Sequence, residues 1–431
     1  MAQAVTDPVE RQREALDSVS YEDLYKRWEK GNWSAYEIDF SRDHEHWHQT
    51  FTDIERRAAM WNYTLFFHGE DSVTDNLSPY IDAAPLEEQK YFLATQQVDE
   101  ARHSVFFNRF MQEVVEVRGD RIAGALEATR PELTWGFRKT FAYLDKVADE
   151  LRRDRSIPNF ARSIFMYHFL VEATLAQPGQ HFIEGYVTER GILPGFAEGM
   201  HNVSRDEQRH IGFGVKCLSD LYKQDRDCAA AVADLLREMM PFVTAVFVPP
   251  NWDRRYTEVF GSTMEDVFEQ GMLSLEQKMN TAGMPLSSLP GPPPIPVDMT
   301  PRERAERAIA LLEAGYIGEK IGPPEKDTYK VGLLFDLMSR TVDTSATPNG
   351  GATVAWDFTD AEPWFIRIDN GATEAQQGRL ENADLVLRCR FEDWVDIVAR
   401  RRDPRIAMAT GKLRPKGSVR LLLRMGKLFG R

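Results

Sequence analysis

Two five-residue stretches, DEARH at residues 99–103 and DEQRH at residues 206–210, carry one pattern about a hundred residues apart. Each stretch places two acidic residues, then an arginine and a histidine, at identical spacing. Helix positions i and i+3 point to the same side, so a Glu-x-x-His pair on a helix can hold a metal ion. The repeat therefore predicts a site with two nearly equivalent halves, formed by Glu100 with His103 and by Glu207 with His210.

A bundle that supplies Glu-x-x-His from two helices needs one inward carboxylate from each of two other helices. Glu70 lies in FFHGEDSV, with 28 residues between it and the first motif, and Glu172 lies in FLVEATLA, with 33 residues between it and the second. Their apolar neighbours imply burial, where a carboxylate is costly unless it is paired or binds a metal. Glu184 and Glu189 compete with Glu172 but lie beyond Pro178, with shorter gaps to the second motif. We therefore expect Glu70 and Glu172 to complete the set.

Charge and ligand chemistry indicate what such a site would hold. Four glutamates bring four negative charges into the core, and two divalent cations would neutralise them. Oxygen and nitrogen ligands without thiolate suit iron or manganese rather than a structural zinc ion. Asp99 and Asp206 are placed to accept the second ring N–H of a ligand histidine, on their own helix or across the bundle. Arg102 and Arg209 could then neutralise these aspartates.

The chain divides into three segments by composition and periodicity. Residues 1–284 repeat apolar positions at three- and four-residue steps, which predicts an all-α, antiparallel helical bundle. Residues 285–325 include six prolines between 290 and 301, which indicates a stiff linker followed by a connecting helix. Residues 326–431 are predicted to form an α+β domain with an antiparallel sheet. Apolar and polar positions alternate there at residues 354–358, 364–368 and 385–391.

The overall composition restricts the class of protein. The net charge of −14 argues against nucleic-acid binding, although residues 400–431 hold eleven Lys and Arg against one acid. No apolar run approaches the roughly 20 residues of a membrane helix, and the N-terminus lacks the apolar segment of a signal peptide. The three cysteines lack metal-site spacing. These features predict a cytoplasmic protein.

The repeat of a glutamate, about thirty residues and Asp-Glu-x-Arg-His resembles the dimetal-carboxylate proteins of the ferritin-like superfamily over roughly residues 40–225. That superfamily includes ribonucleotide reductase small subunits, bacterial multicomponent monooxygenases, acyl-carrier desaturases and ligand-binding oxidases. The resemblance implies a ferritin-like fold, two metal ions (Fe/Fe or Mn/Fe) and O2 as co-substrate. It also implies that Glu100 and Glu207 bridge the metals in a ligand set of Glu70, Glu100, His103, Glu172, Glu207 and His210.

Within the superfamily, the residues are most similar to ligand-binding oxidases. Radical-generating reductase subunits typically have a tyrosine four residues after the first ligand histidine, where this chain has Phe107. Ligand-binding oxidases have a tyrosine five residues before the third-helix glutamate, and Tyr167 occupies that position. This resemblance makes Tyr167 a candidate catalytic redox residue, against the alternative of a core tyrosine. The valine to which that tyrosine can crosslink is replaced by Ser72, beside Val73.

The last hundred residues, and above all DPRIAMATGKLRPKGSVRLLLRMGKLF at 403–429, resemble the sterol-carrier-protein family. The resemblance implies a sheet and helices that enclose an apolar tunnel for fatty acyl or sterol-like ligands. The last helix, expected at 419–428, is basic and amphipathic. It either closes its own domain or contacts anionic membrane lipid, an acyl carrier or the acidic dimetal domain.

Together these features predict a dimetal-carboxylate oxidoreductase, an O2-dependent oxidase or monooxygenase. Its substrate would be a hydrophobic, acyl or lipid-like molecule, bound or delivered by the second domain. The resemblance also implies that the protein receives electrons from a donor of unknown identity and forms a homodimer. The alternatives are a lipid-binding or transfer protein with a structural metal site, an iron store, and a reductase-type radical protein.

One further histidine group stands outside this scheme. DHEHWH places His44, His46 and His48 at alternate positions. We expect an irregular segment in which these side chains have surface or packing roles.

Overall fold

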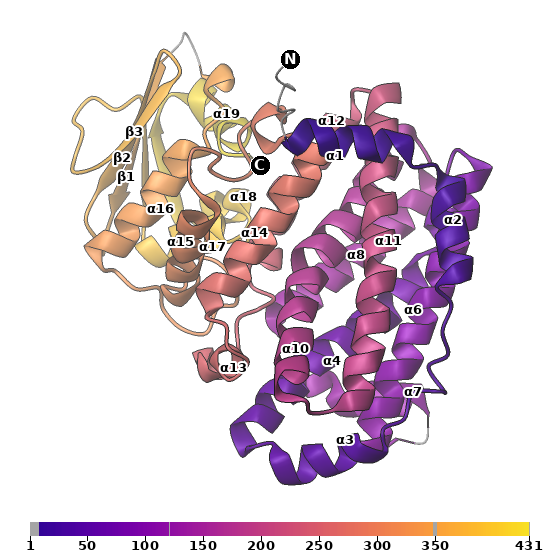
Figure 1. Cartoon of the computed structure of the whole chain (residues 1–431). Coiled ribbons are helices and arrows are strands. Elements are labelled where there is room, and N and C mark those ends of the chain that lie inside the picture. The colour runs from indigo at the N-terminus through magenta and orange to yellow at the C-terminus, as the bar shows by residue number, and fades with distance from the viewer. Residues whose placement is uncertain (1–7, 120, 348–350, 431) are drawn as a thin grey trace, which may run out of the picture. The chain divides into compact units, whose positions relative to one another are not determined.

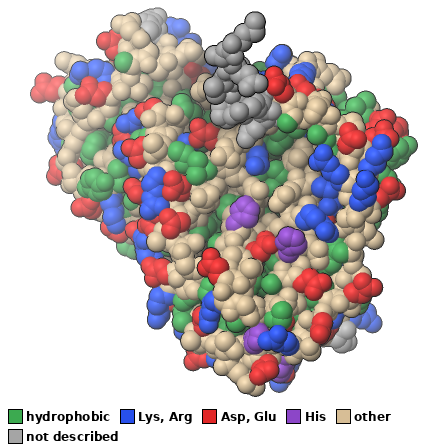
Figure 2. Space-filling view, in the orientation of Figure 1, with side chains coloured by type: hydrophobic (Ala, Val, Ile, Leu, Met, Phe, Trp, Pro, Cys, Tyr) green, Lys and Arg blue, Asp and Glu red, His purple; other side chains and the backbone are tan. Residues whose placement is uncertain are grey.

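The computed structural model describes residues 8–119, 121–347 and 351–430, with side chains from residue 13 onward. The chain separates into two compact units. The first comprises Met1–Val232 and Val246–Pro285, and the second comprises Ala233–Ala245 and Leu286–Arg431. Figure 2 shows acidic and basic side chains interspersed over the viewed face. No helix in the described ranges is both long and apolar enough to cross a membrane.

The first unit is a bundle of helices, as expected from the sequence. Its longest are α4 (Asp53–Asn76), α6 (Glu87–Glu113) and α11 (Pro194–Gln224). A π-helix, η3 (Phe165–Ala176), continues α9 (Ile157–Ile164) and leads into α10 (Gln177–Arg190). α6 packs against α4 and α11 (Figure 1). α11 also packs against η3. The other helices are α1 (Pro8–Ser18), α2 (Tyr21–Lys30), α3 (Ser41–Glu45), η1 (His46–Thr50), α5 (Ser78–Ala83), α7 (Ile122–Thr129), η2 (Arg130–Glu132), α8 (Trp135–Arg153), η4 (Pro250–Trp252), α13 (Arg255–Glu258) and α14 (Met264–Thr281). A further helix, α12 (Cys228–Val243), is divided between the two units, because its residues from Ala233 onward belong to the second.

Local capping fixes where the long helices begin. Thr52 and Glu55 form a reciprocal capping box at the start of α4, which satisfies two backbone donors that the helix leaves unpaired. The start of α11 is capped by a residue that is distant in the sequence. The buried Asp43 of α3 accepts hydrogen bonds from the backbone N–H groups of Gly195 at 2.9 Å and Phe196 at 2.7 Å. The segment before α4 therefore sets the position of α11.

Close approach between α11 and η3 depends on Gly214. A Cβ added there would lie 2.2 Å from Cβ of His168, a separation that requires the backbone to shift. The neighbouring Gly212, on the same helix, has nothing within 4 Å of such a Cβ. Gly214 therefore sets how closely these two helices pack.

Gly214→Ala is expected to destabilise the folded chain by about 1–3 kcal/mol, the usual cost of overpacking a core. Gly212→Ala is the matched control, expected to be neutral or to stabilise by up to about 1 kcal/mol, because alanine favours helix over glycine. Urea denaturation of both variants measures the difference. Equal midpoints for the two variants would contradict the packing argument.

The second unit combines helices with a five-stranded sheet of order β3-β2-β1-β4-β5. The strands are β1 (Gly351–Phe358), β2 (Trp364–Asp369), β3 (Ala372–Gln377), β4 (Leu385–Cys389) and β5 (Leu413–Gly417). The helices are η5 (Leu286–Ser288), α15 (Pro301–Glu313), α16 (Thr328–Arg340), η6 (Thr344–Ala346), α17 (Phe391–Val398), α18 (Pro404–Ala409) and α19 (Val419–Leu428). The α+β class is confirmed.

The sheet is mixed rather than wholly antiparallel, which corrects one expectation. Three pairings are antiparallel, but β1 and β4 are parallel, with Val354 opposite Leu385. Alternation with period two shows which faces are buried but carries no information on the direction of a neighbouring strand. The chain forms the β2–β3 pair on one side of β1 and then crosses to place β4 on the other side.

Candidate metal centre

Four helical segments of the first unit bring the six predicted ligand residues together. Their side chains form two groups, and in each group one possible ligand atom per residue lies within 4.8 Å of the others. Glu100 of α6 and Glu207 of α11 belong to both groups. All six residues are buried. The first group is Glu70, Glu100, His103 and Glu207, and the second is Glu100, Glu172, Glu207 and His210.

Both histidines present the same nitrogen to the carboxylates. Nδ1 of His103 lies 3.2 Å from Oε2 of Glu70 and 3.4 Å from Oε2 of Glu100. Nδ1 of His210 lies 3.1 Å from Oε1 of Glu100 and 3.5 Å from Oε1 of Glu172. A metal ion among these atoms would therefore bind Nδ1 and leave Nε2 for a hydrogen bond.

That Nε2 bond crosses the bundle. Nε2 of His103 on α6 lies 3.3 Å from Oδ2 of Asp206 on α11, and Nε2 of His210 on α11 lies 3.1 Å from Oδ2 of Asp99 on α6. Of the two arrangements that the sequence left open, the structure has the one across the bundle. A carboxylate in this position fixes the histidine tautomer and increases its basicity as a ligand.

Two arginines and two tryptophans also contact these aspartates. Arg102 and Arg209 each contact both Asp99 and Asp206. Trp28 Nε1 donates to Asp99 at 2.9 Å, and Trp33 Nε1 donates to Asp206 at 2.8 Å.

The two tryptophans were missed by the sequence reasoning. Trp28 lies near the end of α2, and Trp33 follows that helix. Both tryptophans are therefore far from the two motifs in sequence. The only available signal was two tryptophans in a polar segment.

The buried group carries more negative charge than its protein surroundings neutralise. Burial raises the pKa of three of its carboxyl groups, those of Glu70, Glu172 and Glu207. Glu100 differs: burial is outweighed by His210 and His103, which hold its pKa well below the usual range. The pKa of both histidines is raised, because the neighbouring carboxylates outweigh burial.

Unpaired carboxylate oxygens indicate that the group fits metal ions. Among the described residues, Oε2 of Glu172 and Oε2 of Glu207 are buried and have no hydrogen-bond partner. Buried polar atoms are rarely left without partners. Two divalent cations would engage these atoms and replace the protons that the buried carboxyl groups otherwise retain.

Comparison with known families identifies the first unit. The sequence pattern of the ribonucleotide reductase small-chain family matches residues 16–245, more than half of the chain. The chain belongs to this family. The pattern of the SCP-2 sterol transfer family matches residues 336–430, so a sterol-carrier domain follows the small-chain domain.

Solved structures agree with this fold. An R2-like ligand-binding oxidase from Sulfolobus acidocaldarius is 22% identical, with a TM-score of 0.52, and the match covers 66% of this chain and 93% of that one. A variant of an R2-like ligand-binding oxidase with an anaerobically reconstituted Mn/Fe cofactor is 24% identical, with a TM-score of 0.51. That match covers 60% of this chain and 94% of the other. At these identities the likeness establishes the fold.

Tyr167 lies directly against the six-residue group of the small-chain domain. Its hydroxyl donates to Oε1 of Glu100 at 2.6 Å. Burial, and then the charge of Glu100, raise the pKa of Tyr167 well above its usual range. The tyrosine is therefore protonated, and it is positioned by the carboxylate of Glu100, which belongs to both groups of possible ligands.

Gln96 is another residue of the site that the motif search missed. Its Nε2 donates to Glu172 at 2.8 Å and to the hydroxyl of Tyr167 at 3.1 Å, and its Oε1 lies 3.1 Å from Nε2 of His168. Burial lowers the pKa of His168 to about 3, so this imidazole is neutral. The position of Gln96, one turn before Glu100, was the signal that could have identified it.

The local backbone of η3 is unusual for a ligand-bearing helix. It runs as a π-helix for 12 residues, and Thr174 Oγ1 donates to the carbonyl of Phe169, five residues earlier, at 2.6 Å. π-helical turns are rare and often occur at functional sites. This winding holds both Tyr167 and Glu172 toward the site.

A cavity of about 60 Å³ reaches the group within the small-chain domain. Its polar lining includes Tyr167 and the four glutamates, and Val73 also lines it. Ser72 is only half-buried. The rest of the lining is mainly apolar and includes Phe66, Phe137, Phe141, Val171, Leu175 and Phe247.

The two glutamates that competed with Glu172 as ligands lie outside the buried group, and so does the residue at the position of a reductase radical tyrosine. Glu184 bonds His201 and Ser204, and Glu189 is exposed. Phe107 is buried and its ring stacks against Phe66 at 5.9 Å. The position of a reductase radical tyrosine is thus filled by apolar packing.

Proposed function

We propose that this chain is a dimetal oxidase that uses O2 to oxidise a hydrophobic, acyl or lipid-like molecule. The observation that carries the proposal is the pair of buried ligand groups sharing Glu100 and Glu207. Six side chains divided between two metal ions leave coordination positions open, as a catalytic rather than structural site requires. Fe/Fe and Mn/Fe both suit these oxygen and nitrogen donors.

The proposed roles follow from the contacts. Glu70, Glu172, His103 and His210 would each bind one metal, and Glu100 and Glu207 would bridge both. When bound in reduced form, the metals would supply electrons for the reduction of O2. Tyr167 holds its proton on the hydroxyl that faces Glu100, where it is available as a redox or proton-donating residue.

The apolar cavity beside the site supports a hydrophobic substrate. A largely apolar wall with a few convergent polar groups is the usual character of a small-molecule site. The sterol-carrier domain is proposed to bind or deliver that substrate, and its ligand class is the reason to propose an acyl or lipid-like molecule. The segment boundaries at 285 and 326 remain a proposal for where the two functions separate.

The proposal predicts O2 consumption by the reduced, metal-loaded chain. The protein would be loaded anaerobically with ferrous iron, or with manganous and ferrous ions together, and mixed with O2-containing buffer with and without fatty acids. We expect uptake of about one O2 per two metal ions, further O2 uptake when a suitable acyl substrate and a reductant are both supplied, and oxidation at Tyr167 in peptide mass spectra if that residue is redox-active.

Two outcomes would oppose the proposal. Tightly bound metal without O2 uptake would favour a lipid-binding or transfer protein with a structural metal site. A stable tyrosyl radical signal in the electron paramagnetic resonance spectrum that persists in a Tyr167→Phe variant would favour a reductase-type radical protein, against the apolar packing of Phe107.

A further inference from the structure

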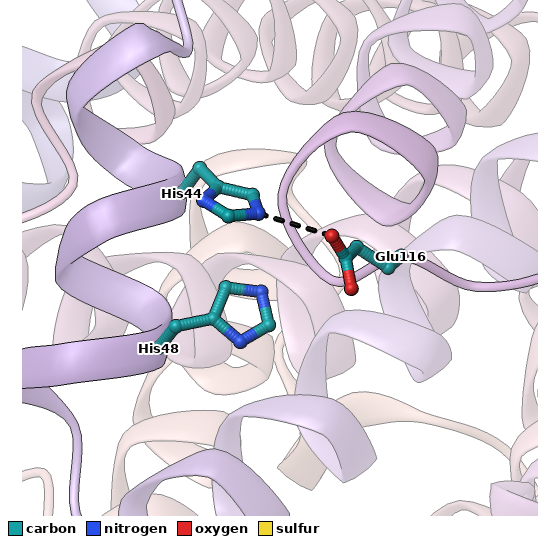
Figure 3. A group of neighbouring side chains, drawn as sticks. All are labelled: His44, His48 and Glu116. Carbon is teal, nitrogen blue, oxygen red and sulfur yellow. Dashed lines mark hydrogen bonds and ion pairs between the residues drawn. The ribbon is translucent and has the colours of Figure 1, made fainter.

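A second group of metal-binding side chains lies on the surface of the small-chain domain, away from the buried carboxylates. His44 of α3 and His48 of η1 are four residues apart and both exposed, and Glu116 follows the end of α6. Figure 3 shows both histidine rings beside Glu116. The DHEHWH segment is helical, not irregular as expected. Its winding places His44 and His48 on one side and His46 on another.

His46 shows this separation. Its Nδ1 accepts a hydrogen bond from the backbone N–H of Leu193 at 3.0 Å. It therefore has the packing role that was expected, whereas His44 and His48 are turned together toward Glu116.

The distances within this group are close to those of a transition-metal site. Nε2 of His44 lies 3.1 Å from Oε1 of Glu116, and the rings of His44 and His48 are 4.4 Å apart between centroids. One possible ligand atom from each of the three residues lies within 4.8 Å of the others. Ligands about 2.0–2.1 Å from a tetrahedral zinc ion are about 3.3 Å from each other. Small side-chain rotations would therefore suffice for all three to bind one ion.

One further contact prepares the group for a cation. Nε2 of His48 lies 3.0 Å from the carbonyl oxygen of Val114, which orients the ring. As an exposed ion pair alone, His44 and Glu116 would contribute little to stability.

We propose that His44, His48 and Glu116 form a surface site for one divalent first-row transition metal ion, with zinc as the best match. Two imidazoles and one carboxylate suit zinc in chemistry and number, and they leave a fourth position for water. The site is distinct in residues and ligand chemistry from the glutamate-rich buried group.

Such an ion would fasten two parts of the bundle. His44 and His48 follow Asp43, which caps α11, in the same helical segment, and Glu116 follows α6. Because the ligands come from positions 72 residues apart, the complete site exists only in the folded chain. Zinc binding should therefore stabilise the fold by mass action.

The test compares zinc binding by the wild type, a His44→Gln, His48→Gln variant and a His201→Gln control, all with the buried site already loaded with iron. His201 is an exposed histidine whose Nδ1 lies 3.1 Å from Oε1 of Glu184. Wild type and control are expected to bind one added zinc per chain, and the double variant none. Zinc at a hundredfold its dissociation constant should raise the thermal unfolding midpoint of the wild type and of the His201→Gln control by about 5 °C.

A second background separates this site from the buried one. Zinc titration of a Glu100→Ala, Glu207→Ala chain should still show one site, again lost when His44 and His48 are replaced. Binding that survives the histidine replacements, or no binding by the wild type below about 1 mM free zinc, would overturn the proposal. Neither result depends on whether the buried centre is an oxidase.

Discussion

Replacing Glu100 and Glu207 together by alanine is expected to abolish binding of both buried metal ions. Each of these glutamates belongs to both ligand groups. Their loss would leave each metal with one glutamate and one histidine, too few ligands to compete with water. Metal analysis after anaerobic reconstitution should give about two iron or manganese ions per wild-type chain and essentially none in the variant.

The stability of the metal-free chain supplies an internal control. The buried group holds more carboxylates than its histidines can neutralise, so removing two of them should not lower the unfolding midpoint of the metal-free protein. Glu198→Ala, an exposed glutamate on the same helix as Glu207, should retain both metals. A folded double variant that still binds two ions would show that the ligand assignment is wrong, and a wild type that binds none would remove the basis for the oxidase.

The grouping of these six side chains can be predicted from the sequence where it depends on spacing within one helix. The three-residue spacing of Glu100 and His103 is sufficient to place both on one face, and the search for two more buried carboxylates reached Glu70 and Glu172. These predictions need only helical periodicity and the cost of burying a charge. They do not require knowledge of how the helices pack.

What depends on packing between helices could not be predicted in the same way. The bonds of Trp28 and Trp33 to the two aspartates join residues 71 and 173 positions apart, and no local pattern encodes them. The contact of Gly214 with His168 is likewise a property of two surfaces. The π-helical winding of Phe165–Ala176 is another such feature, because its apolar sequence is equally compatible with an α-helix.

The same limit explains the β-sheet and the surface histidines. Alternation located the strands around Val354 and Leu385 but could not show that they run parallel. The polarity of DHEHWH predicts an irregular segment, whereas the helical winding from Ser41 to Thr50 decides which histidines lie together. Glu116, which completes that group, comes from a distant part of the chain.

The cross-bundle hydrogen bonds predict opposite metal defects for two matched variants. Asp206→Asn should weaken the metal bound by His103, and Asp99→Asn should weaken the metal bound by His210, each by about 10–100-fold. The reason is that each aspartate bonds the histidine of the other helix. Asparagine keeps the size of the side chain but loses its charge, so the histidine loses a strong acceptor.

Anomalous diffraction at limiting metal would measure the occupancy of the two positions separately. If each aspartate acted on the histidine of its own motif, Asp206→Asn would instead deplete the position beside His210. If the aspartates acted only through overall charge, both variants would weaken both positions equally, since Arg102 and Arg209 contact both aspartates. The hydrogen bonds of the folded chain agree only with depletion of the His103 position by Asp206→Asn and of the His210 position by Asp99→Asn. That result would mean that the aspartate of each sequence motif orients the ligand histidine of the other motif.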